Sequence, residues 1–178
     1  MIKAKLFGFL SLVFALAFGQ GTLAQVSSNK VGAHGDWFVF EYGKPKECWG
    51  TSPPLITKAT KDGKKIDVRR GDIGLYVRFV EGGNTKGDVS FVSGYSIDSE
   101  APIEIEIDKT SFSLVKYKEF EEWVWVKEEE YDQVLNELKK GKMAVVTATS
   151  ARTGTKTVDI FSLKGFTDAM LDAEVRCK

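Results

Sequence analysis

Histidine and cysteine are scarce in this chain of 178 residues, which contains only His34, Cys48 and Cys177. A Ser-His-Asp or Cys-His catalytic arrangement would have to use His34, and no Gly-x-Ser-x-Gly motif is present. A tetrahedral zinc site would have too few ligands if both cysteines are oxidised. The Gly- and Thr-rich stretch 149–157 does not match a phosphate-binding loop. We therefore expect no catalytic residue, no metal site and no cofactor.

Long apolar runs are also lacking, apart from residues 6–18 near the N-terminus. Lys3 and Lys5 precede this run, and the small residues Thr22 and Ala24 follow it at the −3 and −1 positions of a cleavage site. The run is shorter than the roughly 20 apolar residues that span a bilayer. This pattern predicts a cleaved signal peptide, residues 1–24, and an exported protein in the periplasm or at the cell surface.

The chain also lacks an excess of positive or of negative charge. Without the signal peptide the chain keeps 23 basic and 25 acidic side chains over residues 25–178. Such a near-neutral chain gives no reason to expect binding to nucleic acid or to an anionic membrane. Its size fits one domain with one core, residues 25–178, and no transmembrane span remains.

The two cysteines are expected to form one disulfide, Cys48–Cys177, because an even number in an oxidising compartment favours pairing. The bridge would close a loop of about 130 residues and stabilise the fold by about 5 kcal/mol in the chain-entropy account. Two free thiols or a redox pair are the alternative, although the sequence has no Cys-x-x-Cys spacing.

Apolar and polar residues alternate along much of the chain, and turn residues separate the alternating stretches. This pattern predicts a mainly β protein. Asp62-Gly63 has the residues of a tight hairpin turn. The expected strands lie in the stretches 36–42, 58–72, 73–81, 87–96, 102–117, 121–126, 142–150 and 156–163. Short strands at this spacing favour an antiparallel, Ig-like β-sandwich.

Two short helices interrupt the strand pattern. In the stretch 128–141, apolar side chains recur at Tyr131, Val134, Leu135 and Leu138, which is one helical face. Acidic residues in its first turn and two lysines before Gly141 agree with helix ends. The second helix begins near Phe166 and carries Cys177 in its last turn, with Ala169, Met170 and Ala173 on the same face.

Trp123 and Trp125 stand beside the acidic residues Glu119, Glu121 and Glu122, a mixture that sugar-binding clefts also use. We take Trp123, Trp125 and Glu121 as candidate binding residues. Because both tryptophans alternate with valines, the competing interpretation is that one face of this strand belongs to the core. Paired carboxylates of a glycosidase are a further alternative.

The tripeptide Arg70-Gly71-Asp72 matches a motif that host integrins bind when a loop displays it. Its position between two expected strands also suits an ordinary turn. We keep these three residues as a second candidate binding site.

Several stretches together resemble the invasion associated locus B (IalB) family of exported alphaproteobacterial proteins. They include "KECWGTSPP", "VRRGDIGLYV" and "TKTVDIFSLKGFTDAMLDAEVRC", and the resemblance extends from about residue 31 to residue 177. The family often has Arg-Gly-Thr before the last strand, where this chain has Arg152-Thr153-Gly154. The resemblance implies a compact Ig-like sandwich without catalytic residues. It also implies an association with virulence, because the family is named for a pathogen's locus associated with entry into red blood cells.

Two functional hypotheses follow. The first is an exported, non-enzymatic protein that binds an envelope or host-cell component. The second is a periplasmic small-ligand or glycan-binding module that uses the Trp123/Trp125 region. We also expect the C-terminal helix to cover the open end of the sandwich, with the disulfide holding it in place.

Overall fold

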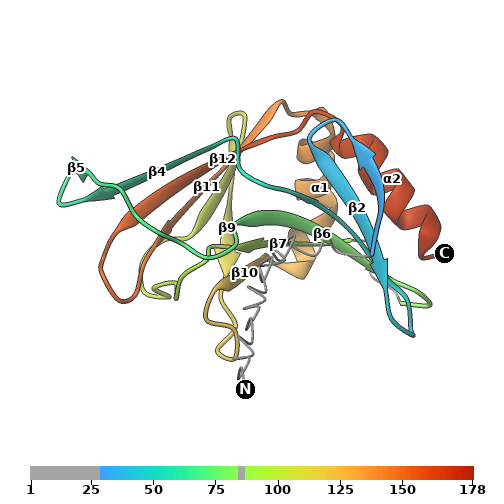
Figure 1. Ribbon diagram of the computed structural model, residues 1–178, viewed down its shortest axis with the longest axis horizontal. Coiled ribbons are helices and arrows are strands. Elements are labelled where there is room, and N and C mark those ends of the chain that lie inside the picture. Colours follow the sequence, from blue (N-terminus) through green and yellow to red (C-terminus); the bar gives the residue numbers. More distant parts are fainter. Residues whose placement is uncertain (1–28, 84–86) are drawn as a thin grey trace, which may run out of the picture.

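A computed structural model describes residues 29–83 and 87–178 of the chain (Figure 1). The expected signal peptide, residues 1–24, lies outside the described residues, and its cleavage stays a prediction. The described residues form twelve strands, two α-helices and one short 3-10 helix. The strands are β1 (Lys30–His34), β2 (Trp37–Tyr42), β3 (Glu47–Ser52), β4 (Ile56–Lys61), β5 (Lys64–Lys65), β6 (Gly74–Val80), β7 (Asp88–Val92), β8 (Glu104–Ile107), β9 (Thr110–Val115), β10 (Trp123–Val126), β11 (Met143–Thr149) and β12 (Lys156–Ser162).

All strand pairs are antiparallel, and they join in the order β1-β2-β3-β6-β7-β10-β9-β8-β11-β12-β4-β5. β9 pairs with β10 on one side and with β8 on the other, so it links the two halves of the sheet. The inner faces of the halves pack together, as the edge-to-face contact between Phe91 of β7 and Phe161 of β12 shows, with ring centroids 6.1 Å apart. The antiparallel β-sandwich expected from the sequence is confirmed.

The alternating pattern explains which side chains face this core. In β10, Val124 and Val126 are fully buried, whereas Trp123 and Trp125 lie on the outer face and are half-buried. The hairpin at Asp62-Gly63 is confirmed, since both residues have positive φ angles, 50° and 72°.

The sequence did not predict β1 and β3. Each contains a glycine, which has low strand propensity, and pairing with β2 holds both in the sheet. The stretch 102–117, taken as one alternating segment, is a hairpin of β8 and β9. Asp108 turns the chain there with a φ of 52°.

The two predicted helices are present as α1 (Tyr131–Lys140) and α2 (Phe166–Arg176). The first turn expected for α1 is instead the 3-10 helix η1 (Glu128–Glu130). The helical faces are oriented as expected, because Val134, Leu135 and Leu138 are buried in α1, as are Phe166, Ala169, Met170 and Ala173 in α2.

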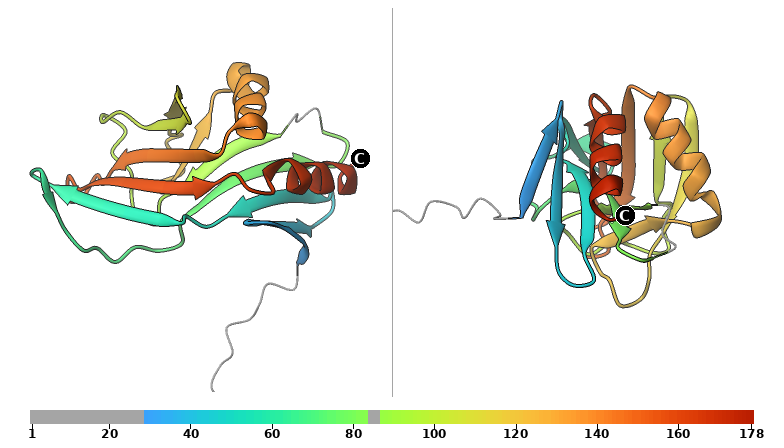
Figure 2. Two further views of the ribbon diagram at one scale, coloured as in Figure 1. Left: turned by 90° about the horizontal axis from the view of Figure 1, so that it is seen from above. Right: turned by 90° about the vertical axis from the view of Figure 1, so that its right-hand side faces the viewer.

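α2 does not close an end of the sandwich as we expected. It continues beyond the end of β12 and packs against β1, β2, β3 and β6, where it forms the second layer in place of strands (Figure 2). The disulfide Cys48–Cys177 is confirmed, with 5.9 Å between the two Cα atoms. It joins the C-terminal end of α2 to the buried face of β3, so the last residues of the chain are fixed to a strand near its start.

Candidate functional site

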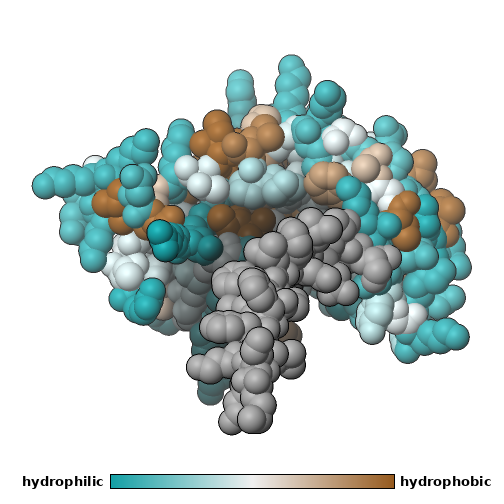
Figure 3. Space-filling model, viewed as in Figure 1, coloured by the Kyte–Doolittle hydropathy of each residue, from teal (hydrophilic) through white to brown (hydrophobic). Residues whose placement is uncertain are grey.

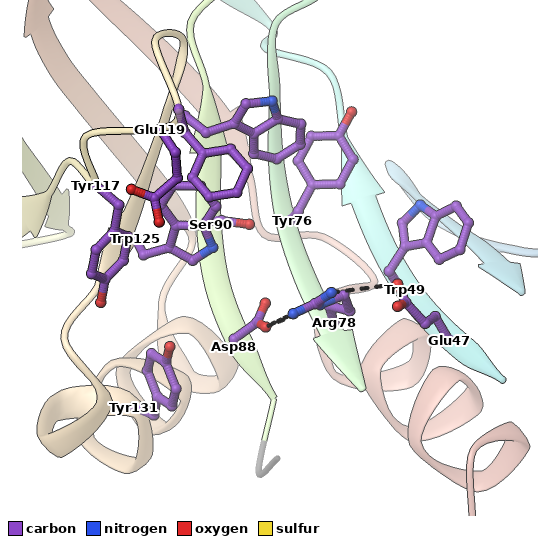
Figure 4. A pocket seen from close by; sticks show the side chains of 12 residues that line it. Glu47, Trp49, Tyr76, Arg78, Asp88, Ser90, Tyr117, Glu119, Trp125 and Tyr131 are labelled. Carbon is purple, nitrogen blue, oxygen red and sulfur yellow. Dashed lines mark hydrogen bonds and ion pairs between the residues drawn. The ribbon is translucent and has the colours of Figure 1, made fainter. Parts of the chain in front are cut away.

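A hollow lies on the outer face of β3, β6, β7 and β10. It has a volume of about 780 Å³, and we call it the aromatic groove (Figure 4). It is lined by Glu47, Trp49, Tyr76, Arg78, Asp88, Ser90, Tyr117, Glu119, Phe120, Trp123, Trp125 and Tyr131. On the face seen in Figure 3, hydrophobic side chains are scattered in separate patches among hydrophilic ones.

Strand register explains why this part of the sheet is hollow. Ser90 of β7 lies opposite Tyr76 of β6 on one side and opposite Trp125 of β10 on the other. A small side chain between two large aromatic ones leaves a depression above β7. Asp88 and Ser90 therefore form a polar floor, and the aromatic side chains of the neighbouring strands form the walls.

The aromatic walls are packed against each other, which fixes their positions. The ring centroid of Trp123 lies 5.0 Å from that of Tyr76 and 6.1 Å from that of Trp125. On the other side, Trp125 contacts Phe120 at 4.9 Å and Tyr117 at 5.4 Å, both from the loop before β10. Such contacts reduce the freedom that the side chains would lose on binding a ligand.

The groove offers hydrogen-bond donors that the fold does not use. Trp37, in the core, donates its indole N–H to the carbonyl oxygen of Ser162 at 2.9 Å. Within the described part of the chain, the indole N–H groups of Trp49, Trp123 and Trp125 have no acceptor. Three half-buried indoles with free N–H groups on one surface are suited to a polar ligand.

An ion-pair network occupies one end of the floor. Arg78 donates from Nε and Nη2 to Oδ2 of Asp88, at 3.0 and 2.8 Å, and its Nη1 lies 3.4 Å from Oε2 of Glu47. Burial raises the pKa of Asp88, and the hydrogen bond from Arg78 opposes this rise. In Figure 4 the second carboxylate oxygen of Asp88 points toward the hollow, where it can accept a hydrogen bond.

Tyr131, at the start of α1, stands at the same end of the groove. Burial is the main cause that raises the pKa of its hydroxyl to about 12, and the negative charge of Asp88 adds to it. The phenol is therefore neutral at physiological pH and keeps its proton for donation.

The structure brings some of the predicted site residues together. Trp123 and Trp125 line the groove, and so does Glu119. The Glu121 side chain is exposed and is not among the lining residues, although its backbone carbonyl accepts the N–H of Ile97.

The three residues of the second candidate site are not displayed as a unit. Arg70 points into the protein, where its two Nη atoms lie 2.7 Å from the carboxylate oxygens of Asp159, a residue with no exposed surface. Gly71 donates its N–H to the carbonyl of Gly94. Asp72 alone is an exposed side chain. This geometry assigns Arg70 to the interior of the sandwich.

His34 lies in β1, where its Nε2 is 2.9 Å from Oδ2 of Asp172 in α2. The hydrogen bond from His34 is the main cause that lowers the pKa of Asp172. In residues 29–83 and 87–178, no group of three or more histidine, cysteine or acidic side chains is arranged to hold a metal ion. Within the same ranges, no helix has the length and apolar character needed to cross a membrane.

Most of the groove could not be found from the sequence. Trp49, Tyr76, Arg78 and Asp88 are separated along the chain, and only the strand order β3-β6-β7-β10 places them side by side. Tyr131 was expected on a buried helical face, yet it is only partly buried and lines the groove. The density of aromatic residues in the stretch 117–125 was a signal in the sequence that points to Tyr117 and Phe120 as well.

The fold defines an antiparallel β-sandwich whose C-terminal helix is held to an early strand by a disulfide. This chain is similar in structure to invasion associated protein B from Bartonella henselae, with a TM-score of 0.54. The similarity covers 81% of this chain and 95% of that one, at 16% sequence identity. No family model and no curated protein matches the chain. The resemblance expected from the sequence is thus confirmed at the level of the fold.

Proposed function

We propose that the chain is an exported, non-enzymatic binding protein of the invasion associated locus B type, which binds an envelope or host-cell component through the aromatic groove. The groove carries this proposal, because its volume of about 780 Å³ and its mixture of aromatic and polar groups are typical of ligand sites. Export is supported by the signal-like N-terminus and by the disulfide, which persists in oxidising compartments.

A glycan is the ligand class that the groove favours. A sugar ring has apolar C–H faces and a rim of hydroxyl groups. The walls formed by Tyr76, Trp123 and Trp125 suit the faces, and the floor of Asp88 and Ser90 suits the hydroxyls. The free indole N–H groups add donors for the hydroxyl oxygens.

Binding without hydrolysis is the expected outcome. The described lining residues include no histidine or cysteine, and the Asp88 carboxylate is already engaged by Arg78. Glu119, the lining acid next to the tryptophans, is exposed. We expect no release of reducing ends from oligosaccharides incubated with the protein.

Co-sedimentation tests the proposal. The chain from residue 25 onward is incubated with purified peptidoglycan and, separately, with outer-membrane vesicles. We expect it to sediment with one of them, and we expect Ser90→Leu, which fills the hollow, and Trp125→Ala to weaken this binding about tenfold. Leu171→Ala is the control, since Leu171 is exposed on α2, away from the groove. Equal sedimentation of all four proteins would overturn the proposal, and sedimentation of none would exclude an envelope partner.

Protease treatment of intact cells separates the two kinds of partner. If the protein is digested while a periplasmic control survives, its groove faces host components. If it survives until the outer membrane is opened, the partner belongs to the envelope.

A further inference from the structure

We infer that the aromatic groove selects glycans that carry free amino groups, an inference that rests on the proposed binding function. The argument depends on the sign of the charge that the groove presents, on its aromatic faces, and on the strand that forms its floor.

The described lining residues carry an excess of negative charge. Glu47, Asp88 and Glu119 contribute three carboxylates, and Arg78 contributes one positive charge that is already paired with two of them. Lys116 and Lys118 of the adjacent loop do not line the groove. The lining therefore attracts a cation and repels an anionic sugar, an effect that salt weakens because the Glu47 and Glu119 side chains are exposed to solvent.

The aromatic faces favour the same charge. The face of an aromatic ring is the negative part of its quadrupole and attracts ammonium groups within about 6 Å. One such contact is present on the outer surface of this sheet, where Nζ of Lys30 lies 3.9 Å from the ring centroid of Phe38. Phe38 lies opposite Thr51, and Thr51 lies opposite Tyr76 of the groove wall, so all three belong to one cross-strand row. The groove has aromatic rings of the same kind. None of the described residues places a cation over them.

A sugar scaffold fits the floor better than a peptide does. Peptides that bind along a sheet normally pair their backbone with an exposed strand edge. β7, below the groove, is paired with β6 on one side and β10 on the other, so its backbone groups are already used. A ligand above β7 meets only side chains, namely the hydroxyl of Ser90, the free oxygen of Asp88 and the indole N–H groups. A chain of hydroxyl-bearing rings can use all of them.

Calorimetric titration with four tetramers of matched length tests this inference. The probes are a glucosamine tetramer, its neutral N-acetylated counterpart, tetragalacturonate and tetralysine, at about pH 6, where amino groups are protonated. We expect the glucosamine tetramer to bind about tenfold more tightly than its N-acetylated counterpart and than tetralysine, and tetragalacturonate to bind most weakly. An increase of the salt concentration from about 0.05 M to about 0.5 M should reduce the preference for the charged sugar.

A pair of isosteric variants shows whether the groove is the origin of this preference. Glu119→Gln removes one carboxylate from the lining and should reduce the preference roughly threefold. Glu104→Gln removes an exposed carboxylate from the outer face of β8 and should leave it unchanged. Both side chains are exposed, so neither change is expected to disturb folding.

Each other outcome overturns the inference in a distinguishable way. Equal or tighter binding of the N-acetylated tetramer would show that charge is not selected, while the proposed binding function would stand. Tetralysine that binds as tightly as the glucosamine tetramer would show that a cation suffices without a sugar. If no tetramer binds but sedimentation still depends on Ser90 and Trp125, only this inference fails. If that dependence is also missing, the proposed function fails with it.

Discussion

Replacement of Arg70 by alanine should destabilise the protein strongly, although the sequence places Arg70 in a motif associated with exposed loops. The side chain is 6% exposed, and its guanidinium forms two hydrogen bonds of 2.7 Å with Asp159 and a third, from Nε, with the carbonyl of Ser93 at 2.9 Å. The Arg70→Ala variant would leave the charge of Asp159 buried without a partner. Loss of one member of such a pair costs about 3–5 kcal/mol.

This cost is large in comparison with the stability of a typical domain, about 5–15 kcal/mol. For a domain of this size, 1 kcal/mol corresponds to about 2–4 °C in Tm. We therefore expect the Tm of Arg70→Ala to lie about 6–20 °C below that of the wild type. Thermal unfolding followed by circular dichroism measures the difference.

Two further variants make the assay specific for the buried pair. Asp72→Ala changes the exposed acid of the same tripeptide and should alter stability by less than about 0.5 kcal/mol. The double variant Arg70→Met/Asp159→Leu removes both charges and should be more stable than Arg70→Ala alone. An Arg70→Ala protein that melts within about 2 °C of the wild type would refute the reasoning and return Arg70 to the list of binding residues.

Two other predictions concern the C-terminal helix and the groove. Cys177→Ser should lower the free energy of unfolding by up to about 5 kcal/mol, because the bridge closes a loop between residues 129 positions apart. Unfolding in urea measures this, and a variant as stable as the oxidised wild type would contradict the role given to the disulfide. Burial raises the pKa of Tyr131 to about 12 in the folded state. The hydroxyl of Tyr131 therefore stays protonated above the ordinary tyrosine pKa near 10. The stability from this group is present below about pH 10 and is lost as pH rises through about 12. Tyr131→Phe should remove the last phenol to ionise in an ultraviolet titration, and an unchanged titration curve would refute the assignment.

Local patterns were sufficient to predict much of the fold. The period of the apolar residues placed both helices and oriented their buried faces, and the Asp62-Gly63 turn was found from its residue types. The disulfide followed from the number of cysteines. β1 and β3 were missed because their glycine-containing sequences depend on pairing with β2 for their conformation.

The groove is a product of long-range strand order, which explains why the sequence indicated only part of it. Trp123 and Trp125 were identified because they are adjacent to acidic residues. Their valine neighbours face the core, so the tryptophans are on the outer face. The partners contributed by β3, β6 and β7 come from positions that are separated in sequence and that only the sheet brings into register. Arg70 shows the limit of a short motif, which suggested display while its buried partner Asp159 lies 89 residues further along the chain.

The indole N–H signals in a ¹H–¹⁵N spectrum test the central claim, that the aromatic groove is the binding surface, most directly. The chain has four tryptophans, of which Trp49, Trp123 and Trp125 line the groove and Trp37 is buried in the core with its N–H bonded to Ser162. During titration with the glucosamine tetramer, we expect the signals of Trp123 and Trp125 to shift and saturate together, while that of Trp37 stays in place. Saturable binding that leaves the three groove signals unmoved would show that the ligand site lies elsewhere.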